Sequence, residues 1–392
     1  MITRTTIPRT MPENRTDPAW LRVARKLGAY EMRSLVAMTA HGAGWLMIAT
    51  LLINSSQAAV PDLSDTFAQV NPTVVEIRTL SSPSSATNNG TTPTGEIGLG
   101  SGVLIAEDQV LTASHVVEVA DRIHVRLLDG TTRRARVTSS ERFADVSLLT
   151  LDTAVSGIEP AKLGDSDQAR VGDRVFVIGA PYGISHTLTV GYVSALHLDD
   201  ASGGFGYVNL IQTDAAINAG NSGGPMFNED GELIGIVSHI RSRSGGSEGL
   251  GFAVAINSAR ELVIDQRSFW SGFLGVLLPP KLARALNVPQ TSGMLIQQIA
   301  EDSPAKVMGL RESDIFIEVD GRPLMVGGDI ILAANGIRLD SPDAVLKVRD
   351  AIRAMPSGER LTIEILRQGQ RQTIGFALDP DSPKPEQSNS VQ

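Results

Sequence analysis

The sequence predicts a mainly β protein. Short runs rich in β-branched residues recur between residues 61 and 267, and turn signals such as Asp129-Gly130 and Asp230-Gly231 separate them. Glycine is abundant, with 38 residues, whereas aromatic residues make up only 4% of the chain. Many short strands joined by tight turns explain the glycine content. This spacing favours a sandwich or a barrel over alternating βαβ units.

Each β-branched run of residues 61–267 is expected to form one strand. These strands are Val74–Leu80, Gly102–Ile105, Ile123–Leu128, Val146–Leu151, Arg174–Ile178, Thr187–Leu196 and Leu233–Ile240. The stretch Ser81–Gly95 is rich in Ser, Thr, Asn, Pro and Gly, which predicts an exposed loop. Asn257-Ser258 is expected to cap a closing helix over Ala259–Gln266.

A second unit is expected over residues 269–378. Short strands alternate there with two helix signals, the first between Ser303-Pro304 and Gly309 and the second between Ser341-Pro342 and Pro356. The last segment, residues 379–392, is rich in Pro, Ser and Gln, and this composition predicts a disordered tail.

Residues 1–58 are expected to direct the chain out of the cytoplasm. A basic region precedes an uncharged run from Leu35 to Ile53, and small residues follow at Ser56 and Ala58. Two interpretations stay open: a cleaved signal peptide, complete even if Met32 is the true start, or a single membrane anchor. A buried helix of the folded domain is the third. Both leading interpretations place the rest of the chain in the periplasm or cell envelope.

Composition excludes several classes of function. The net charge of −9, with no long basic run in the folded part, argues against a nucleic-acid partner. The absence of cysteine rules out a disulfide, a thiolate nucleophile and a cysteine-based metal site. The six histidines are scattered without a zinc-binding pattern. We therefore expect neither a metal nor another cofactor.

Three residue types that together activate a hydroxyl group occur in one β-rich segment. His115 follows Thr112-Ala113-Ser114, Asp145 precedes a predicted strand, and Ser222 lies in Gly220-Asn-Ser-Gly-Gly-Pro225. Serine needs a base within hydrogen-bond reach, histidine suits that task near neutral pH, and a carboxylate orients the imidazole. The order His, Asp, Ser is that of chymotrypsin-type proteases. Each residue alone has an ordinary structural explanation, but the three together predict a catalytic triad.

The residues around Ser222 predict an oxyanion hole. Glycines permit a sharp turn that exposes the hydroxyl group. In the turn formed by Gly220, Asn221 and Ser222, we expect the N–H groups of Gly220 and Ser222 to converge on one point, where they stabilise a developing negative charge.

Residues 61–267 resemble the HtrA family (DegP- and DegS-like) of trypsin-fold serine proteases. The matching stretches are Gly98–Val103, Leu111–Val117, Asp145–Leu149, Ile178–Gly183, Gly191–Ala195, Gln212–Asn218, Gly220–Pro225 and Gly249–Ala253. The resemblance implies two six-stranded β-barrels, with His115 and Asp145 on one and Ser222 on the other. It also implies an ATP-independent endopeptidase of the bacterial envelope that cleaves unfolded or regulatory proteins, built as a homotrimer.

The second unit resembles a PDZ domain, as that family leads one to expect. Phe273, Leu274, Gly275 and Val276 match the loop and strand that receive a peptide C-terminus. Gly327-Gly-Asp-Ile-Ile-Leu332 and Asn335-Gly336 strengthen the resemblance. About 15 extra residues, including Asp320-Gly321, separate Gly309–Ile315 from this motif, and they predict an inserted β-hairpin.

Residue 221 bears on activation. Trypsin-type zymogens have an aspartate at this position, which pairs with a freed N-terminal amine, and asparagine cannot supply that charge. We therefore expect no activation by N-terminal cleavage. By resemblance, the loop His197–Tyr207 is the candidate sensor, with a plain connector as the alternative.

The primary specificity pocket is expected to accept small or medium aliphatic side chains. The position six residues before Ser222, which in trypsin-like specificity is an aspartate, is Ala216. Ile217 is expected to narrow the pocket, and His239, Ile240 and Arg241 form the opposite wall by resemblance. Arg241 either points to solvent, which we favour, or partly lines the pocket.

These observations predict an exported serine endopeptidase with one protease domain and one PDZ domain. The main alternative is a chaperone-like peptide-binding protein in which proteolysis is minor or silent. An acyl hydrolase with the same triad is disfavoured by the order His, Asp, Ser along the chain.

Overall fold

The computed structural model describes residues 62–81, 96–199, 208–266, 268–356 and 358–378. All of them belong to one compact unit, Pro61–Gln392. The predicted leader or anchor in residues 1–58, most of the Ser81–Gly95 loop and the tail 379–392 lie outside the described residues. Within the part of the chain that is described, no helix is both long and apolar enough to cross a membrane.

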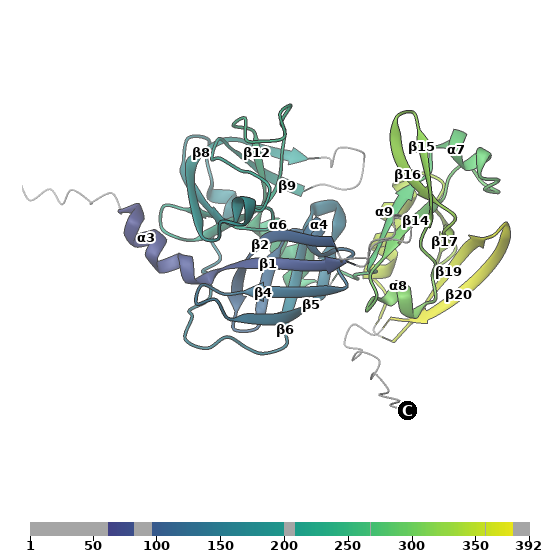
Figure 1. The fold of residues 1–392 in the computed structure, drawn as a ribbon, viewed down its shortest axis with the longest axis horizontal. Helices are drawn as coiled ribbons and strands as arrows, with labels where there is room; N and C mark the ends of the chain where they lie inside the picture. Colours follow the sequence, from purple (N-terminus) through teal and green to yellow (C-terminus); the bar gives the residue numbers. More distant parts are fainter. Residues whose placement is uncertain (1–61, 82–95, 200–207, 267, 357, 379–392) are drawn as a thin grey trace, which may run out of the picture. The chain divides into compact units, whose positions relative to one another are not determined.

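The described chain begins with a short amphipathic helix and a closed β-barrel (Figure 1). Helix α3 (Leu63–Val70) starts at Asp62, whose side chain accepts a hydrogen bond from the Ser64 N–H. The barrel strands are β1 (Val74–Ser81), β2 (Glu96–Ala106), β3 (Gln109–Thr112), β4 (Arg122–Arg126), β5 (Thr132–Glu141) and β6 (Val146–Leu151). They close in the order β1-β2-β3-β6-β5-β4, so every strand is paired on both edges.

A second closed barrel repeats this arrangement. Its strands are β7 (Arg174–Gly179), β8 (Thr187–Asp199), β9 (Val208–Thr213), β10 (Pro225–Asn228), β11 (Leu233–Ile240) and β12 (Gly251–Ala255). They close in the order β10-β11-β12-β9-β8-β7. The chain then turns into helix α6 (Ile256–Ala259), which continues as a π-helical turn over Arg260–Asp265. The predicted pair of six-stranded barrels is therefore confirmed.

Apolar side chains fill each barrel and also the space between the two. Ile77, Leu104 and Leu149 belong to the interior of the first barrel, and Val177 and Met226 to that of the second. A third cluster joins the barrels. In it, Leu111 and Val146 from the first barrel pack with Phe176 and Phe227 from the second, whose ring centroids are 5.3 Å apart. This shared core fixes one barrel against the other.

The closing helix differs from the prediction at its start. Asn257 and Ser258 lie inside α6, and the residue before the helix is Ala255, which makes no side-chain cap. The two polar side chains have other partners: the Asn257 amide donates to Asp165, and the Ser258 hydroxyl accepts from the Asn209 N–H. Tertiary hydrogen bonds thus use the residues that the sequence pattern suggested as caps.

The C-terminal part is a β-sheet with helices, consistent with a PDZ fold. The sheet has the order β13-β14-β17-β19-β20, and β18 pairs with β17. Its strands are β13 (Phe273–Leu277), β14 (Met294–Ile299), β17 (Ile330–Ala334), β18 (Ile337–Arg338), β19 (Arg360–Arg367) and β20 (Gln370–Ala377). The helices are α7 (Pro280–Ala285), α8 (Pro304–Val307) and α9 (Pro342–Arg353).

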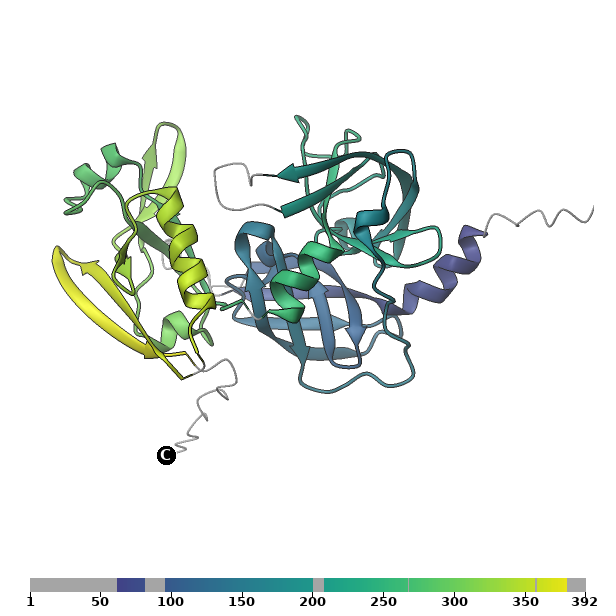
Figure 2. The ribbon, with the colours of Figure 1, turned by 180° about the vertical axis from the view of Figure 1, so that it is seen from behind.

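Helices α8 and α9 begin where the sequence predicts. The Ser303 hydroxyl accepts from the Lys306 N–H and the Ser341 hydroxyl from the Ala344 N–H, so each serine caps the helix that its following proline opens. Val345, Val348 and Ile352 pack α9 into the core of the sheet (Figure 2).

The predicted inserted hairpin is also confirmed. That hairpin consists of β15 (Ile315–Val319) and β16 (Arg322–Val326), which pair in antiparallel register. Asp320 and Gly321 form its turn with φ angles of 50° and 74°. Two consecutive positive φ angles are typical of the tight turn whose twist matches that of two paired strands.

Candidate active site

His115 and Asp145 are brought together by two short segments of the first barrel. His115 lies on the short helix α4 (Ser114–Val117) after β3, and Asp145 follows the 3₁₀ turn Arg142–Ala144 before β6. The imidazole Nδ1 is 2.9 Å from each Asp145 carboxylate oxygen, and the His115 N–H donates to Asp145 Oδ1 at 3.0 Å. Asp145 adopts a left-handed conformation with φ 54°, which the bond from its N–H to the Arg142 carbonyl supports.

Ser238 completes this group, and the sequence analysis did not identify it. Its hydroxyl donates to Asp145 Oδ2 at 2.5 Å, and its backbone carbonyl accepts a hydrogen bond of 3.4 Å from the Ser222 hydroxyl. Ser238 is buried in β11 of the second barrel, so it links the carboxylate of one barrel to the nucleophile of the other. The only sequence signal was its position directly before His239 and Ile240.

The charges of the two paired groups depend on their surroundings. Burial raises the pKa of Asp145, but hydrogen bonds from His115 and Ser238 and the charge of His115 outweigh it, so the pKa is lowered overall. Burial lowers the pKa of His115, but the hydrogen bond and charge of Asp145, with the charge of Glu118, raise it above 6.5 overall. Asp145 is therefore ionised at neutral pH, and it favours the Nδ1–H form of the imidazole.

Glu118 is a second carboxyl group near this pair. It follows α4 directly, its side chain is only 14% exposed, and it lies 3.3 Å from the Arg142 Nε. Burial raises its pKa to about 7, and the charge of Asp145 acts in the same direction, against the opposing charges of Arg142 and His115. Glu118 thus changes its charge in the same pH range as His115.

Ser222 lies in the turn between β9 and β10. In the described structure its hydroxyl contacts the Ser238 carbonyl rather than His115. The hydrogen bond between a catalytic serine and its base is often long or misaligned before substrate binds. The structure therefore places Ser222 next to Ser238, which in turn contacts Asp145 of the His115–Asp145 pair.

The turn around Ser222 presents two backbone donors. Among the described residues, neither the Gly220 N–H nor the Ser222 N–H has a hydrogen-bond partner. Gly220 has φ 102°, and a Cβ atom there would overlap the Ala180 carbonyl oxygen, so only glycine fits. The Asn221 N–H, in contrast, donates to the Asn218 carbonyl at 3.0 Å. Asn221 therefore belongs to the expected oxyanion turn without supplying a donor.

The four residues expected to line the specificity pocket lie on two faces of the second barrel. Ile217 is 2% exposed and packs, with Ile240, in the barrel interior. A Cβ atom on Gly251 would lie 2.6 Å from Ile217 Cδ1, so the isoleucine fills the space beside that glycine.

His239 is exposed on β11, and Arg241 is exposed directly after that strand. The His239 ring stacks on Phe252 with centroids 5.0 Å apart, and the Arg241 guanidinium lies 6.0 Å from the same ring. Ile240 packs instead against the interior cluster of the barrel. The pocket formed by Ile217, His239, Ile240 and Arg241 stays a prediction.

Phe273, Leu274, Gly275 and Val276 all lie on β13, the edge strand of the C-terminal sheet. Among the described residues this strand pairs only with β14, so its other edge is open. Phe273 of β13, Met294 of β14, and Val345, Val348 and Ile352 of α9 belong to one apolar cluster. An extended chain added to the open edge would place alternate side chains beside this cluster.

The expected sensor loop falls mostly outside the described residues. Strand β8 reaches Asp199 and β9 starts at Val208, and residues 200–207 between them are not described.

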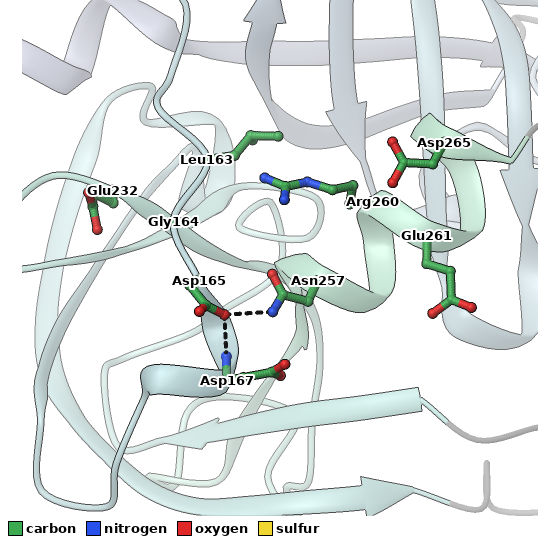
Figure 3. A pocket seen from close by; sticks show the side chains of 9 residues that line it. All are labelled: Leu163, Gly164, Asp165, Asp167, Glu232, Asn257, Arg260, Glu261 and Asp265. Atoms are coloured by element: carbon green, nitrogen blue, oxygen red, sulfur yellow. Dashed lines mark hydrogen bonds between the residues drawn. The ribbon is translucent and has the colours of Figure 1, made fainter.

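A cavity of about 640 Å³ has none of the triad residues in its lining (Figure 3). Its lining is Leu163, Gly164, Asp165, Asp167, Glu232, Asn257, Arg260, Glu261 and Asp265. Asp165 already accepts hydrogen bonds from the Asn257 amide and the Asp167 N–H. Across the described residues, no cluster of three or more His, Cys, Asp or Glu has an arrangement that could hold a metal ion.

Two closed barrels with a His–Asp pair and a partly buried serine in a glycine-rich turn define a trypsin-like serine peptidase. Residues 100–236 match the family described as "Trypsin-like peptidase domain". A protein named "Probable periplasmic serine endoprotease DegP-like" from Halomonas elongata is 33% identical over 401 residues, which cover 89% of this chain and 78% of the relative. The chain belongs to this DegP-like, HtrA-type family of serine endoproteases.

A second relative supports this assignment. A relative with the same name from Pseudomonas fulva is 36% identical over 289 residues, which cover 71% of this chain. The chain spans 55% of the length of that relative. Among solved structures, "HtrA-type protease AlgW with decapeptide" is 28% identical, with 82% of this chain and 99% of that chain covered and a TM-score of 0.47.

The arrangement of His115 and Glu118 predicts a particular pH profile. A peptidase that uses neutral His115 as its base loses activity as that imidazole is protonated, and because its pKa is raised, the loss begins above pH 6.5. Glu118→Gln removes a negative charge that raises this pKa, so the acidic limb of kcat/KM should move to lower pH. The measurement is kcat/KM for a peptide substrate between pH 5 and pH 9.

Glu159→Gln serves as the control, because Glu159 is exposed and does not act on the pKa of His115. Its acidic limb should coincide with that of the unmodified chain. A Glu118→Gln profile that coincides as well would show that Glu118 does not influence the base.

Proposed function

We propose that this chain is an ATP-independent serine endopeptidase of the cell envelope that cleaves unfolded or regulatory proteins. The observation that carries the proposal is that the His115–Asp145 pair and the Ser222 turn lie at one site. Among the described residues, two N–H groups of that turn are unpaired. Family membership supports the reaction type. The names of the relatives include the word periplasmic, which supports the compartment. Whether residues 1–58 are cleaved or retained stays open.

The reaction follows from these groups. His115 Nε2 takes the proton of the Ser222 hydroxyl as Oγ attacks the carbonyl carbon of the peptide bond. The carbonyl oxygen becomes negatively charged and accepts hydrogen bonds from the N–H groups of Gly220 and Ser222. His115 then gives its proton to the leaving amine, the C–N bond breaks, and an acyl-serine remains. Water, deprotonated by His115, releases the acid and restores Ser222. Asp145 stays ionised and stabilises the imidazolium.

Removal of either proton-transfer partner should abolish peptidase activity without unfolding the chain. Ser222→Ala and His115→Ala should each lower turnover by a factor on the order of 10⁶, because members of a triad act as a unit. Hydrolysis of unfolded casein measures the loss, and circular dichroism checks the fold. Ser156→Ala, which changes an exposed serine, should keep full activity. A Ser222→Ala chain as active as the unmodified one would refute the triad.

We further propose a preference for Val, Ala or Ile before the cleaved bond. Ala216 supplies no carboxylate for a Lys or Arg side chain, and Ile217 fills the space beside Gly251. A basic side chain in such a pocket would lose its hydration without gaining a partner.

Mass spectrometry of casein digests tests the pocket. Most cuts should follow Val, Ala or Ile, and Ile217→Ala should shift the preference towards larger apolar residues such as Leu and Phe, because it removes the side chain that fills the base. A majority of cuts after Lys or Arg would contradict the proposed pocket.

The C-terminal sheet is proposed to act as a PDZ domain that binds free peptide C-termini. The open edge of β13 offers backbone partners, and the apolar side chains of β13 and α9 offer contacts for the side chains of a peptide. Gly272, with φ 72°, precedes β13 in the loop that we expect to hold the terminal carboxylate.

Peptides with a free, apolar C-terminal residue should bind the Ser222→Ala chain more tightly than the same peptides with an amidated C-terminus. The reason is that amidation removes the charge that the loop donors recognise. Fluorescence anisotropy measures both forms. Equal affinity would rule out the groove. If the PDZ domain regulates the protease, the acid form should also raise casein hydrolysis by the unmodified chain.

A homotrimer completes the proposal. Val190 and Tyr192 are 44% and 52% exposed on one face of β8. Large apolar side chains on the surface of a strand that is already paired on both edges support burial against other copies of the chain.

A further inference from the structure

Ser101 is a buried serine of the first barrel that contacts the nucleophile turn of the second. It lies on β2 and has no exposed surface. Its hydroxyl donates to the Gly220 carbonyl at 2.7 Å and accepts from the Ala180 N–H at 2.9 Å. Its own N–H donates to the Ser222 carbonyl at 2.8 Å. A single residue therefore holds two carbonyl groups of the turn that carries the nucleophile.

The carbonyl groups of this turn are each fixed by a separate hydrogen bond. The Ala219 carbonyl accepts from the Tyr182 N–H, and the Asn221 carbonyl accepts from the Gly224 N–H, both at 2.9 Å. The Gly220 and Ser222 carbonyls are the two that Ser101 holds. Along the turn, carbonyl groups bonded to Ser101 thus alternate with carbonyl groups bonded to Tyr182 or Gly224.

Peptide planarity converts these bonds into an orientation of the N–H groups. In a trans peptide the N–H points opposite to the C=O. The Ala219 and Asn221 carbonyls are directed to their partners, so the Gly220 and Ser222 N–H groups face the other way, where they are unpaired. The peptide between Gly220 and Asn221 separates these two donors, and the Ser101 hydroxyl fixes its carbonyl end.

The packing around Ser101 leaves no room for side chains at three neighbouring glycine positions. A Cβ atom on Gly179 would lie 3.1 Å from the Ser101 hydroxyl oxygen, and one on Gly224 would lie 3.2 Å from Ser101 Cβ. On Gly223, a Cβ atom would overlap the Ser101 carbonyl oxygen. Glycines thus let the turn close on Ser101. A hydroxyl group suits the remaining space because it donates and accepts at the same time.

We propose that Ser101 is a positioning residue for the oxyanion hole: its hydroxyl holds the Gly220–Asn221 peptide so that the N–H groups of Gly220 and Ser222 converge. The inference rests on the proposed peptidase function. Without the hydroxyl, the Gly220 carbonyl is unpaired, and the Gly220–Asn221 peptide that links the two donors is no longer held in one orientation. The consequence falls on the transition state, because only there does the oxyanion need both donors.

The test compares Ser101→Ala with Ser139→Ala in the full-length chain. Ser139 is also fully buried in the first barrel, and its hydroxyl accepts from the Ser268 N–H at 2.8 Å, a bond that does not involve the nucleophile turn. Both variants should melt at a lower temperature, since each leaves a buried donor unpaired. Ser101→Cys, which fills the space but has only a weak donor, is measured alongside in case the alanine variant does not fold.

Kinetics and inhibitor binding separate positioning from stability. For a peptide substrate, Ser101→Ala should lower kcat about tenfold or more, with a smaller change in KM and an unchanged acidic limb of the pH profile. Affinity for a peptide trifluoromethyl ketone, whose adduct carries the oxyanion, should fall by a similar factor. Ser101→Cys should show the same pattern, and Ser139→Ala should keep the kcat of the unmodified chain.

Two results would overturn the inference. One is a kcat for the folded Ser101 variants equal to that of the unmodified chain. The other is an equal loss of kcat in Ser139→Ala, which would make the effect a general consequence of lower stability. Failure of the proposed function itself is distinct, because the unmodified chain would then neither hydrolyse the peptide nor form the adduct.

Discussion

The contact between two closed barrels is the constraint on which the rest of this structure depends. A closed barrel leaves no free strand edge, so catalytic groups must come from the connections between strands and from the contact itself. The shared apolar core that contains Leu111 and Phe176 fixes this contact. Ser101 crosses it with two hydrogen bonds to the nucleophile turn, and Ser238 crosses it in the opposite direction to reach Asp145.

Electrostatics then depend on that geometry. Asp145 remains charged although it is largely buried, because His115 and Ser238 donate hydrogen bonds to it. The Ser222 hydroxyl carries no charge in the resting state. Among the described residues, the N–H groups of Gly220 and Ser222 have no hydrogen-bond partner. The protein thus has its fixed charge in the first barrel and its neutral dipoles in the second, and a substrate carbonyl between them experiences both.

Much of the fold and the triad could be predicted from sequence because they depend on local chemistry. Glycines at positive φ, as at Gly220, and paired turn residues, as at Asp320-Gly321, reveal a turn whatever surrounds it. Strand β5 was missed because its first half carries three arginines on a partly solvated barrel wall, where the apolar alternation is weak. Strand β10 was missed because it has only four residues and starts at a proline.

The remainder of the site could not be predicted because it depends on long-range contacts. Ser238 and Ser101 are ordinary serines in strands, and only the three-dimensional structure shows that they reach Asp145 and Gly220. His239 and Arg241 were assigned to a pocket wall by resemblance, and nothing in the sequence indicates that both side chains lie near the ring of Phe252. Glu118 is one residue beyond the helix that carries His115, but nothing in the sequence indicates its burial.

The division of the site between two barrels also affects how the protein is made. Ser101 and Gly220 are 119 residues apart in the chain, and no hydrogen bond between them can form until both barrels have closed. A nascent chain in which only the first barrel has folded holds His115 and Asp145 but no ordered nucleophile. Such an intermediate cannot cleave unfolded copies of the same protein that are nearby. Proteolytic competence therefore requires both barrels to have folded.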